Sequence, residues 1–106
     1  MFEFFGRKSK AAWVKAVFSD PVPAADSVSE ERLRKSTQRI LEERRQIIED
    51  SVRIIQQTRN EDTRQSRMEL CRKHYQKVRE LEPFADGKQR EIVRECEQLL
   101  KEVNLL

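Results

Sequence analysis

Apolar side chains recur every three or four residues along most of the chain, which is the spacing of a helix with one buried face. The longest run, at about 29–59, carries two apolar rows: Leu33, Ile40, Ile47 and Ile54 form one, and Leu41, Ile48 and Ile55 the other. A narrow seam separates them, formed by Thr37, Arg44, Ser51 and Thr58. This arc is wider than a coiled-coil stripe, so it predicts a helix that contacts two neighbours at once.

The apolar positions are also mirrored about two points. Gln56–Arg67 contains twelve residues without an apolar side chain, and apolar residues on either side are equidistant from its midpoint. A second mirror point lies between Ala85 and Asp86. The pairs are Ile55 with Met68, Val52 with Cys71 and Ile48 with Tyr75 about the first point, and Met68 with Val103, Tyr75 with Cys96 and Val78 with Val93 about the second. Tyr75 is therefore expected in the middle layer of the core.

The mirrored pattern predicts an all-α fold, a three-helix antiparallel bundle of up-down-up topology, with helices at about 29–59, 63–82 and 88–104. Pro83 and Gly87 mark the second turn. The first turn contains neither residue type, so Asp62 or Thr63 is the expected cap of the second helix. One continuous helix over 29–82 is the alternative.

The first 20 residues form a separate amphipathic, aromatic segment. A short helix is expected over 7–18, with Trp13 and Phe18 on its apolar side. The sequence DPVP ends this helix, because proline removes a donor and restricts the residue before it. Residues 21–28 are an expected extended linker, and a capping box of Ser27 with Glu30, or Ser29 alone, starts the next helix.

The aromatic segment is the expected cover for one end of the bundle. Because the first long helix exceeds its partners in length, its N-terminal part overhangs near Phe84. The segment folds over this overhang in its own chain, folds over it in a swapped homodimer, or forms a docking surface. The candidate interaction surface is Phe2, Phe4, Phe5, Trp13, Phe18, Leu33, Ile40, Arg44 and Phe84.

Arg44 lies in the seam between the two apolar rows. An unpaired buried charge costs several kcal/mol, so the guanidinium must reach solvent or a carboxylate. Either the bundle narrows here and the stem of Arg44 packs with its head at the edge, or Arg44 pairs with an acidic group of a partner.

Cys71, His74 and Cys96 are the residues most suggestive of chemistry, since the mirror pattern brings them near one level. A fourth zinc ligand is missing, and both cysteines lie on core rows, so a packing role is favoured and no metal or cofactor is expected. His74 is the only histidine, and we expect it to be solvated at the edge of its helix. No Gly-rich phosphate loop or catalytic triad spacing occurs, so we do not expect an enzyme.

The charges do not identify a partner. The chain has 22 basic and 19 acidic residues, interspersed along the helices, and a net charge of +3. Two cysteines, no bilayer-length apolar run and no signal peptide favour the cytoplasm. The leading hypothesis is a non-enzymatic helical protein-protein interaction or adaptor module. Its partner is either another protein or a second copy of itself, and in the second case it forms a homo-oligomer. The alternatives are a small nucleic-acid-binding or regulatory protein, and a peripheral membrane protein anchored by residues 2–18.

Overall fold

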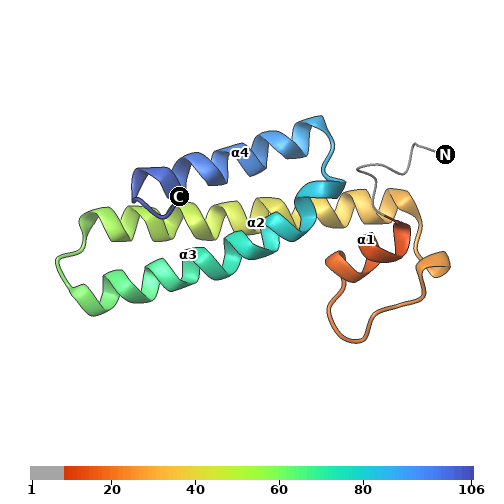
Figure 1. Ribbon diagram of the computed structural model, residues 1–106, viewed down its shortest axis with the longest axis horizontal. Helices are drawn as coiled ribbons and strands as arrows, with labels where there is room; N and C mark the ends of the chain where they lie inside the picture. The colour runs from red at the N-terminus through yellow and green to blue at the C-terminus, as the bar shows by residue number, and fades with distance from the viewer. Residues whose placement is uncertain (1–8) are drawn as a thin grey trace.

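The computed structural model describes residues 9–106, and the ordered elements in this range are all helical. They are α1 (Lys10–Val17), the 3₁₀ turn η2 (Ala25–Ser27), α2 (Glu30–Gln57), α3 (Glu61–Leu81), the 3₁₀ turn η3 (Glu82–Phe84) and α4 (Gly87–Glu102). This confirms the all-α class. Helix α2 is the longest, α3 returns along it in the opposite direction, α4 then runs in the direction of α2, and α1 lies near the start of α2 (Figure 1).

The chain forms two separate helices here, α2 and α3, and not one continuous helix over 29–82. Polar side chains terminate α2 and start α3. Asn60 caps α3 by accepting a hydrogen bond from the amide of Thr63 at 3.0 Å. The Arg64 guanidinium donates to the carbonyls of Ile55 and Thr58, which the end of α2 leaves free. The expected caps, Asp62 and Thr63, were therefore wrong, and α3 begins two residues earlier than expected.

The other helix ends are set by side chains of the expected types. Ser29, the alternative to Ser27, caps α2 by accepting from the amide of Arg32. Asp86 and Gln89 form a capping box at the start of α4. The helix ends at Glu102, short of the expected 104, because Asn104 has a φ of 60° and directs the amide of the next residue to the Leu100 carbonyl.

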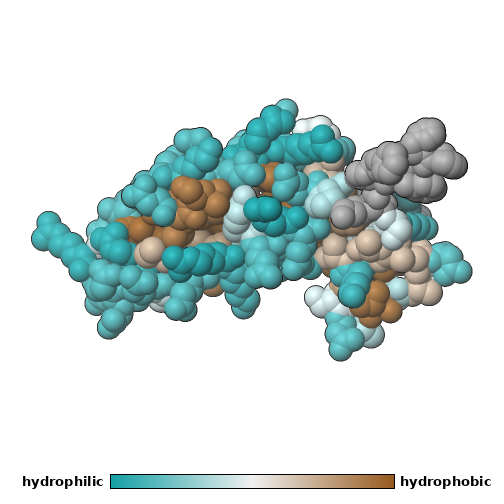
Figure 2. Space-filling view, viewed as in Figure 1, coloured by the Kyte–Doolittle hydropathy of each residue, from teal (hydrophilic) through white to brown (hydrophobic). Residues whose placement is uncertain are grey.

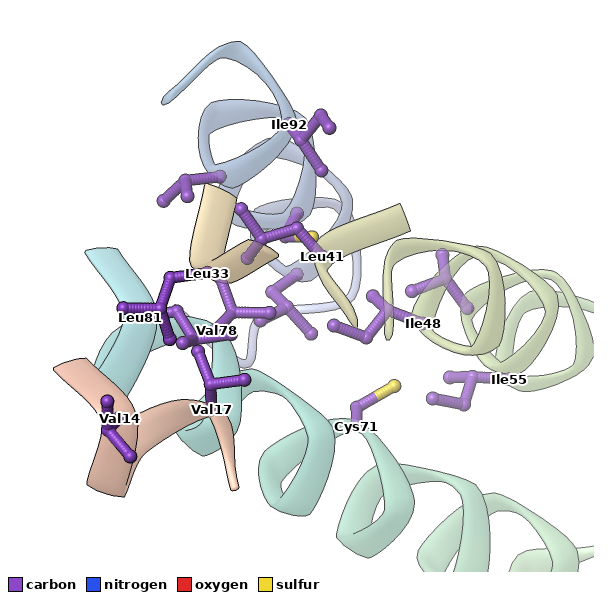
Figure 3. Packing of buried hydrophobic residues seen from close by; sticks show 14 of the residues in the cluster. Val14, Val17, Leu33, Leu41, Ile48, Ile55, Cys71, Val78, Leu81 and Ile92 are labelled. Carbon is purple, nitrogen blue, oxygen red and sulfur yellow. The ribbon is translucent and has the colours of Figure 1, made fainter. Parts of the chain in front are cut away.

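The buried apolar side chains of α1, α2, α3 and α4 form one cluster, part of which Figure 3 shows. From α2 it takes the row Leu41, Ile48 and Ile55, and from the facing helices Cys71, Val78, Leu81, Ile92, Val93, Cys96 and Leu100. Helix α1 adds Val14 and Val17, which lie beside Leu81 and Val78 (Figure 3). Thus the apolar row of α2 that contains Ile48 is buried throughout.

Tyr75 does not occupy the middle of the core as expected. Its ring is half-buried, its hydroxyl donates to Glu97 of α4 at 3.3 Å, and the Arg79 guanidinium lies over the ring at 6.0 Å. The phenol therefore lies at the α3–α4 edge, because its hydroxyl needs a polar partner that the core does not offer.

The segment over 21–28 is held to the helices and is not extended throughout. It contains η2, Ala25 packs against the core, and Val28 is buried. The connection between α1 and α2 therefore holds α1 beside α2 and α3, at the end where α2 overhangs (Figure 1).

Candidate interaction surface

The aromatic side chains near the start of α2 contact one another within the chain. Trp13 stacks on Phe84 with ring centroids 5.6 Å apart, and its indole Nε1 donates to Thr37 Oγ1 at 3.0 Å. The guanidinium of Arg32 lies 5.4 Å from the centroid of the Phe18 ring. All three rings are half-buried. In this structure, the described part of the aromatic segment thus packs over the overhang of its own α2.

Three members of the expected surface, Phe2, Phe4 and Phe5, lie outside the described residues. Leu33 is fully buried, so it belongs to the core and cannot contact a partner. It lies on the same sequence row as Ile40, Ile47 and Ile54, yet it is fully buried in the core cluster and those three remain half-buried. The row is therefore divided, with its first member inside the core and its later members at the surface.

Arg44 meets His74 across the interface of α2 and α3. Its Nη1 lies 2.7 Å from His74 Nδ1, and both side chains are half-buried. The contact is a hydrogen bond that the guanidinium donates to neutral imidazole, since guanidinium carries no acceptor. Burial, together with the charges of Arg44 and Lys73, lowers the pKa of His74 below 6.5, which keeps the ring neutral. His74 is thus an acceptor for Arg44 and not the freely solvated residue expected.

The Arg44–His74 contact shows which faces of the two helices adjoin. On α2, Ile40 and Ile47 lie about one helical turn from Arg44 and Ile54 lies two turns beyond Ile47, all on the side away from α4. On α3, Leu70 lies one turn before His74. We call these six residues the α2–α3 flank: Ile40, Arg44, Ile47, Ile54, Leu70 and His74. The apolar side chains Ile47, Ile54 and Leu70 are half-buried and lie outside the main hydrophobic cluster.

Helix α1 covers one end of this flank. Lys77, seven residues after Leu70 and therefore on the same side of α3, donates to the carbonyl of Ala16 in α1. Trp13 reaches Thr37 of α2 from the same helix. Beyond α1, toward Ile54, no helix of the described chain packs on the flank. The flank thus begins under a docked helix and continues uncovered.

Sequence reasoning named Ile40 and Arg44 of this flank but missed Ile47, Ile54 and Leu70. The signal was present in the second apolar row of α2. That row was expected to contact a neighbouring helix. Instead, α3 and α4 both pack around the row of Ile48, and the later members of the other row, Ile47 and Ile54, remain at the edge.

Other hydrophobic surface is limited in the view of Figure 2, where polar and charged side chains cover most of the described chain. Hydrophobic atoms gather near the end of α4 and around α1 (Figure 2). The large apolar residues most exposed are Leu106, at 52%, and Val22, at 46%. Leu106 follows α4, and Val22 lies in the connection between α1 and η2.

Cys71 and Cys96 are free and fully buried. Burial raises the pKa of Cys96 to about 12, and it also raises the pKa of Cys71, although the nearby Ser51 hydroxyl and two arginines offset part of that rise. Thiols held in the neutral form are poor nucleophiles and poor metal ligands. Within 9–106, no three cysteine, histidine or acidic side chains gather as metal ligands would.

The hollows of the described surface are small, about 400–440 Å³, and charged side chains line part of each. One groove of about 400 Å³ between α2 and α4 contains the Arg45–Glu95 ion pair, with N···O 2.6 Å, and also Glu49, Gln98, Leu99 and Glu102. Most other ion pairs join residues three or four positions apart on one helix, such as Lys35 with Glu31. Such pairs belong to a solvated helix face and contribute little stability.

None of the helices in residues 9–106 has an apolar stretch long enough to cross a bilayer. Comparisons of this chain with protein-family models, with curated proteins and with solved structures gave no match.

Proposed function

We propose that this chain is a non-enzymatic helical protein-interaction module: a three-helix antiparallel bundle of α2, α3 and α4, stabilised by α1, that binds a protein partner through the α2–α3 flank. One observation carries this proposal. Ile47, Ile54 and Leu70 form an apolar strip outside the core, and the strip borders Arg44, whose guanidinium has no carboxylate partner among the described residues.

The apolar strip supplies a driving force for association. Burying apolar surface contributes about 25 cal/mol per Å², and the half-buried Ile47, Ile54 and Leu70 keep apolar surface that a partner would remove from water. Helix α1 shows what the adjoining surface of α2 and α3 accepts: its Val14 and Val17, three residues apart, are buried beside Leu81 and Val78 (Figure 3), and its Ala16 carbonyl accepts a hydrogen bond from Lys77. A partner helix with the same i, i+3 apolar spacing fits the open part.

Arg44 supplies specificity. It already donates to His74, and its remaining N–H groups are free to bind an acceptor. A carboxylate is the acceptor that matches a guanidinium in charge and geometry, and the apolar surroundings strengthen such a pair once water is displaced. The partner surface is therefore expected to combine apolar side chains with an aspartate or glutamate.

Photo-crosslinking from the flank tests this proposal. A photoreactive phenylalanine analogue is placed at Ile47 and, as a matched control, at the adjacent exposed Gln46, which points away from the flank. We expect a discrete protein adduct from position 47 in cells and none from position 46. Mass spectrometry then identifies the adduct, and titration of the purified partner with the Ile47→Glu and Gln46→Glu variants measures affinity.

The expected result is that Ile47→Glu weakens binding at least tenfold and Gln46→Glu does not. Equal adducts from both positions, or binding that Ile47→Glu leaves unchanged, would contradict the proposal. Adducts with nucleic acid, or loss of the protein into the lipid fraction on vesicle flotation, would favour the nucleic-acid or membrane alternative instead.

A further inference from the structure

We propose that α1 is a built-in competitor of the partner helix: it occupies the surface next to the open part of the α2–α3 flank, and it leaves this surface when the partner binds. The inference rests on the proposed function, because it adds regulation to the same surface. It is carried by the contacts of α1 and by the length of the open part of the flank.

Helix α1 binds the bundle as a helical partner would, with two apolar side chains inward and its backbone held at one end. Val14 and Val17 are buried beside two side chains of α3 (Figure 3). Trp13 is held by a ring stack and by the hydrogen bond of its indole, and Lys77 donates to the carbonyl of Ala16. We call the surface under α1 the α1 seat: Thr37, Lys77, Val78, Leu81 and Phe84.

The α1 seat and the α2–α3 flank adjoin on both helices. On α2, Thr37 of the seat lies three residues before Ile40 of the flank. On α3, His74 of the flank lies three residues before Lys77 of the seat. Positions three apart are neighbours on the surface of a helix. The seat and the flank therefore form one continuous surface between α2 and α3, and α1 covers only its first part (Figure 1).

The length of this surface favours a partner helix that takes both parts. From Arg44 to Ile54 the open part is about 15 Å long at 1.5 Å per residue, which is room for about ten residues of a helix. Helices this short are marginal in water. From Thr37 to Ile54 the whole surface is about 26 Å long, which is room for about 17 residues. A partner helix therefore gains both length and apolar contact when it takes the α1 seat as well.

Helix α1 is short enough to be displaced. It has eight residues, fewer than an isolated helix needs to be stable in water, so its helical form depends on the seat. It binds there because its connection to α2 keeps its effective concentration high. Residues 19–24, which precede the packed Ala25, span up to about 20 Å when extended. This length lets α1 leave the seat while α2, α3 and α4 stay folded.

The exchange of α1 for the partner is an order–disorder transition of one segment. The apolar side chains of the partner then replace Val14 and Val17 over the seat, so the core stays covered. The apparent affinity of the partner is reduced by the fraction of molecules in which α1 occupies the seat. A change that loosens α1 should therefore strengthen partner binding without any new contact to the partner.

Native-state hydrogen exchange of the wild type tests whether α1 opens separately. We expect the amides of residues 14–18 to share one protection factor, because the whole helix leaves together, and not to be graded from its ends. This protection factor should be at least tenfold lower than those of Ile48 and Val78 in the bundle.

Photo-crosslinking of a loosened variant tests the competition. Val17→Ser weakens the buried side of α1, and Lys15→Ser on its exposed side is the matched control. With the photoreactive residue at position 47, we expect the yield of the protein adduct in cells to rise at least threefold in Val17→Ser and to stay unchanged in Lys15→Ser. Circular dichroism verifies that α2, α3 and α4 remain folded in both variants.

Amides of α1 that exchange only with global unfolding would show that α1 is a fixed part of the fold, and the competition would be wrong. An adduct yield that Val17→Ser leaves unchanged or lowers would overturn it as well. In both cases a discrete adduct from position 47 in the wild type leaves the proposed function standing. Absence of the adduct from the wild type and from Val17→Ser alike contradicts the proposed function itself.

Discussion

At the scale of single residues, two buried hydroxyls on the seam of α2 have opposite environments. Thr37 Oγ1 donates to the Leu33 carbonyl and accepts from Trp13, so its hydrogen-bonding capacity is used. Ser51 Oγ, about four turns further along α2, lies in the core with no hydrogen-bond partner among the described residues, and the thiol of Cys71 beside it is a weak donor. The helical pattern in the sequence predicted that both positions face a neighbour but not which hydroxyl is satisfied.

Replacing these two residues should therefore change stability in different directions. Ser51→Ala removes an unsatisfied buried hydroxyl and should leave the free energy of unfolding unchanged or raise it by up to about 1 kcal/mol. Thr37→Val keeps the shape but leaves the Trp13 indole without its acceptor, and should cost about 1–3 kcal/mol. Urea denaturation followed by Trp13 fluorescence measures both. A larger loss for Ser51→Ala than for Thr37→Val would contradict this assignment.

His74 makes the stability of the folded chain depend on pH. Its folded-state pKa lies below 6.5, whereas the unfolded chain has the ordinary value, so the unfolded state binds the proton more readily as pH falls through about 6.5. This histidine therefore lowers stability on acidification and has no effect well above pH 7. His74→Gln keeps an acceptor for Arg44 and removes the titrating group. The melting temperature of this variant should therefore fall less between pH 7.5 and pH 5.5 than that of the wild type.

An NMR titration checks the cause directly, because His74 is the only histidine of the chain. Its ring should titrate with a pKa below 6.5, and Arg44→Gln should raise that pKa by removing the neighbouring positive charge. A pKa at or above 6.5 in the wild type would show that the ring is solvated, as the sequence alone had indicated.

At the scale of elements, the periodicity of apolar residues was sufficient to find the helices and insufficient to place their ends. The turn between α2 and α3 contains neither Gly nor Pro, and its geometry depends on Asn60 and Arg64. A guanidinium that reaches back nine residues to a carbonyl leaves no periodic signal. The sequence did predict that the segment of Trp13 covers the bundle near Phe84, but it left open whether the segment covers its own chain or another, and the stacking of the two rings leaves no periodic signal.

The role of Arg64 in this turn can be measured. Arg64→Leu removes the donors to the Ile55 and Thr58 carbonyls and should lower the free energy of unfolding by about 1–2 kcal/mol. Gln65→Leu, at the next position, removes only an exposed side-chain contact with Glu61 and should change it by less than about 0.5 kcal/mol. Equal effects in chemical denaturation would show that the guanidinium does not hold the turn.

At the scale of the whole molecule, the two apolar rows of α2 have separate roles. The row of Ile48 builds the core with α3 and α4, and the row of Ile47 begins under α1 and continues to the surface. The sequence displays both rows but cannot say which is covered, because that depends on how far around α2 the two other helices pack. The proposed interaction surface follows from that tertiary arrangement.

The most direct test of this account compares the two rows by urea denaturation at low protein concentration, where association is negligible. The Ile47→Gln/Ile54→Gln double variant should lose less than about 1 kcal/mol in total, because surface changes away from structural features are nearly neutral. Ile48→Ala or Ile55→Ala, one turn or less away in the buried row, should each lose about 2–5 kcal/mol. If the double variant instead loses as much stability as the core variants, Ile47 and Ile54 serve folding, and the α2–α3 flank is not a surface kept for a partner.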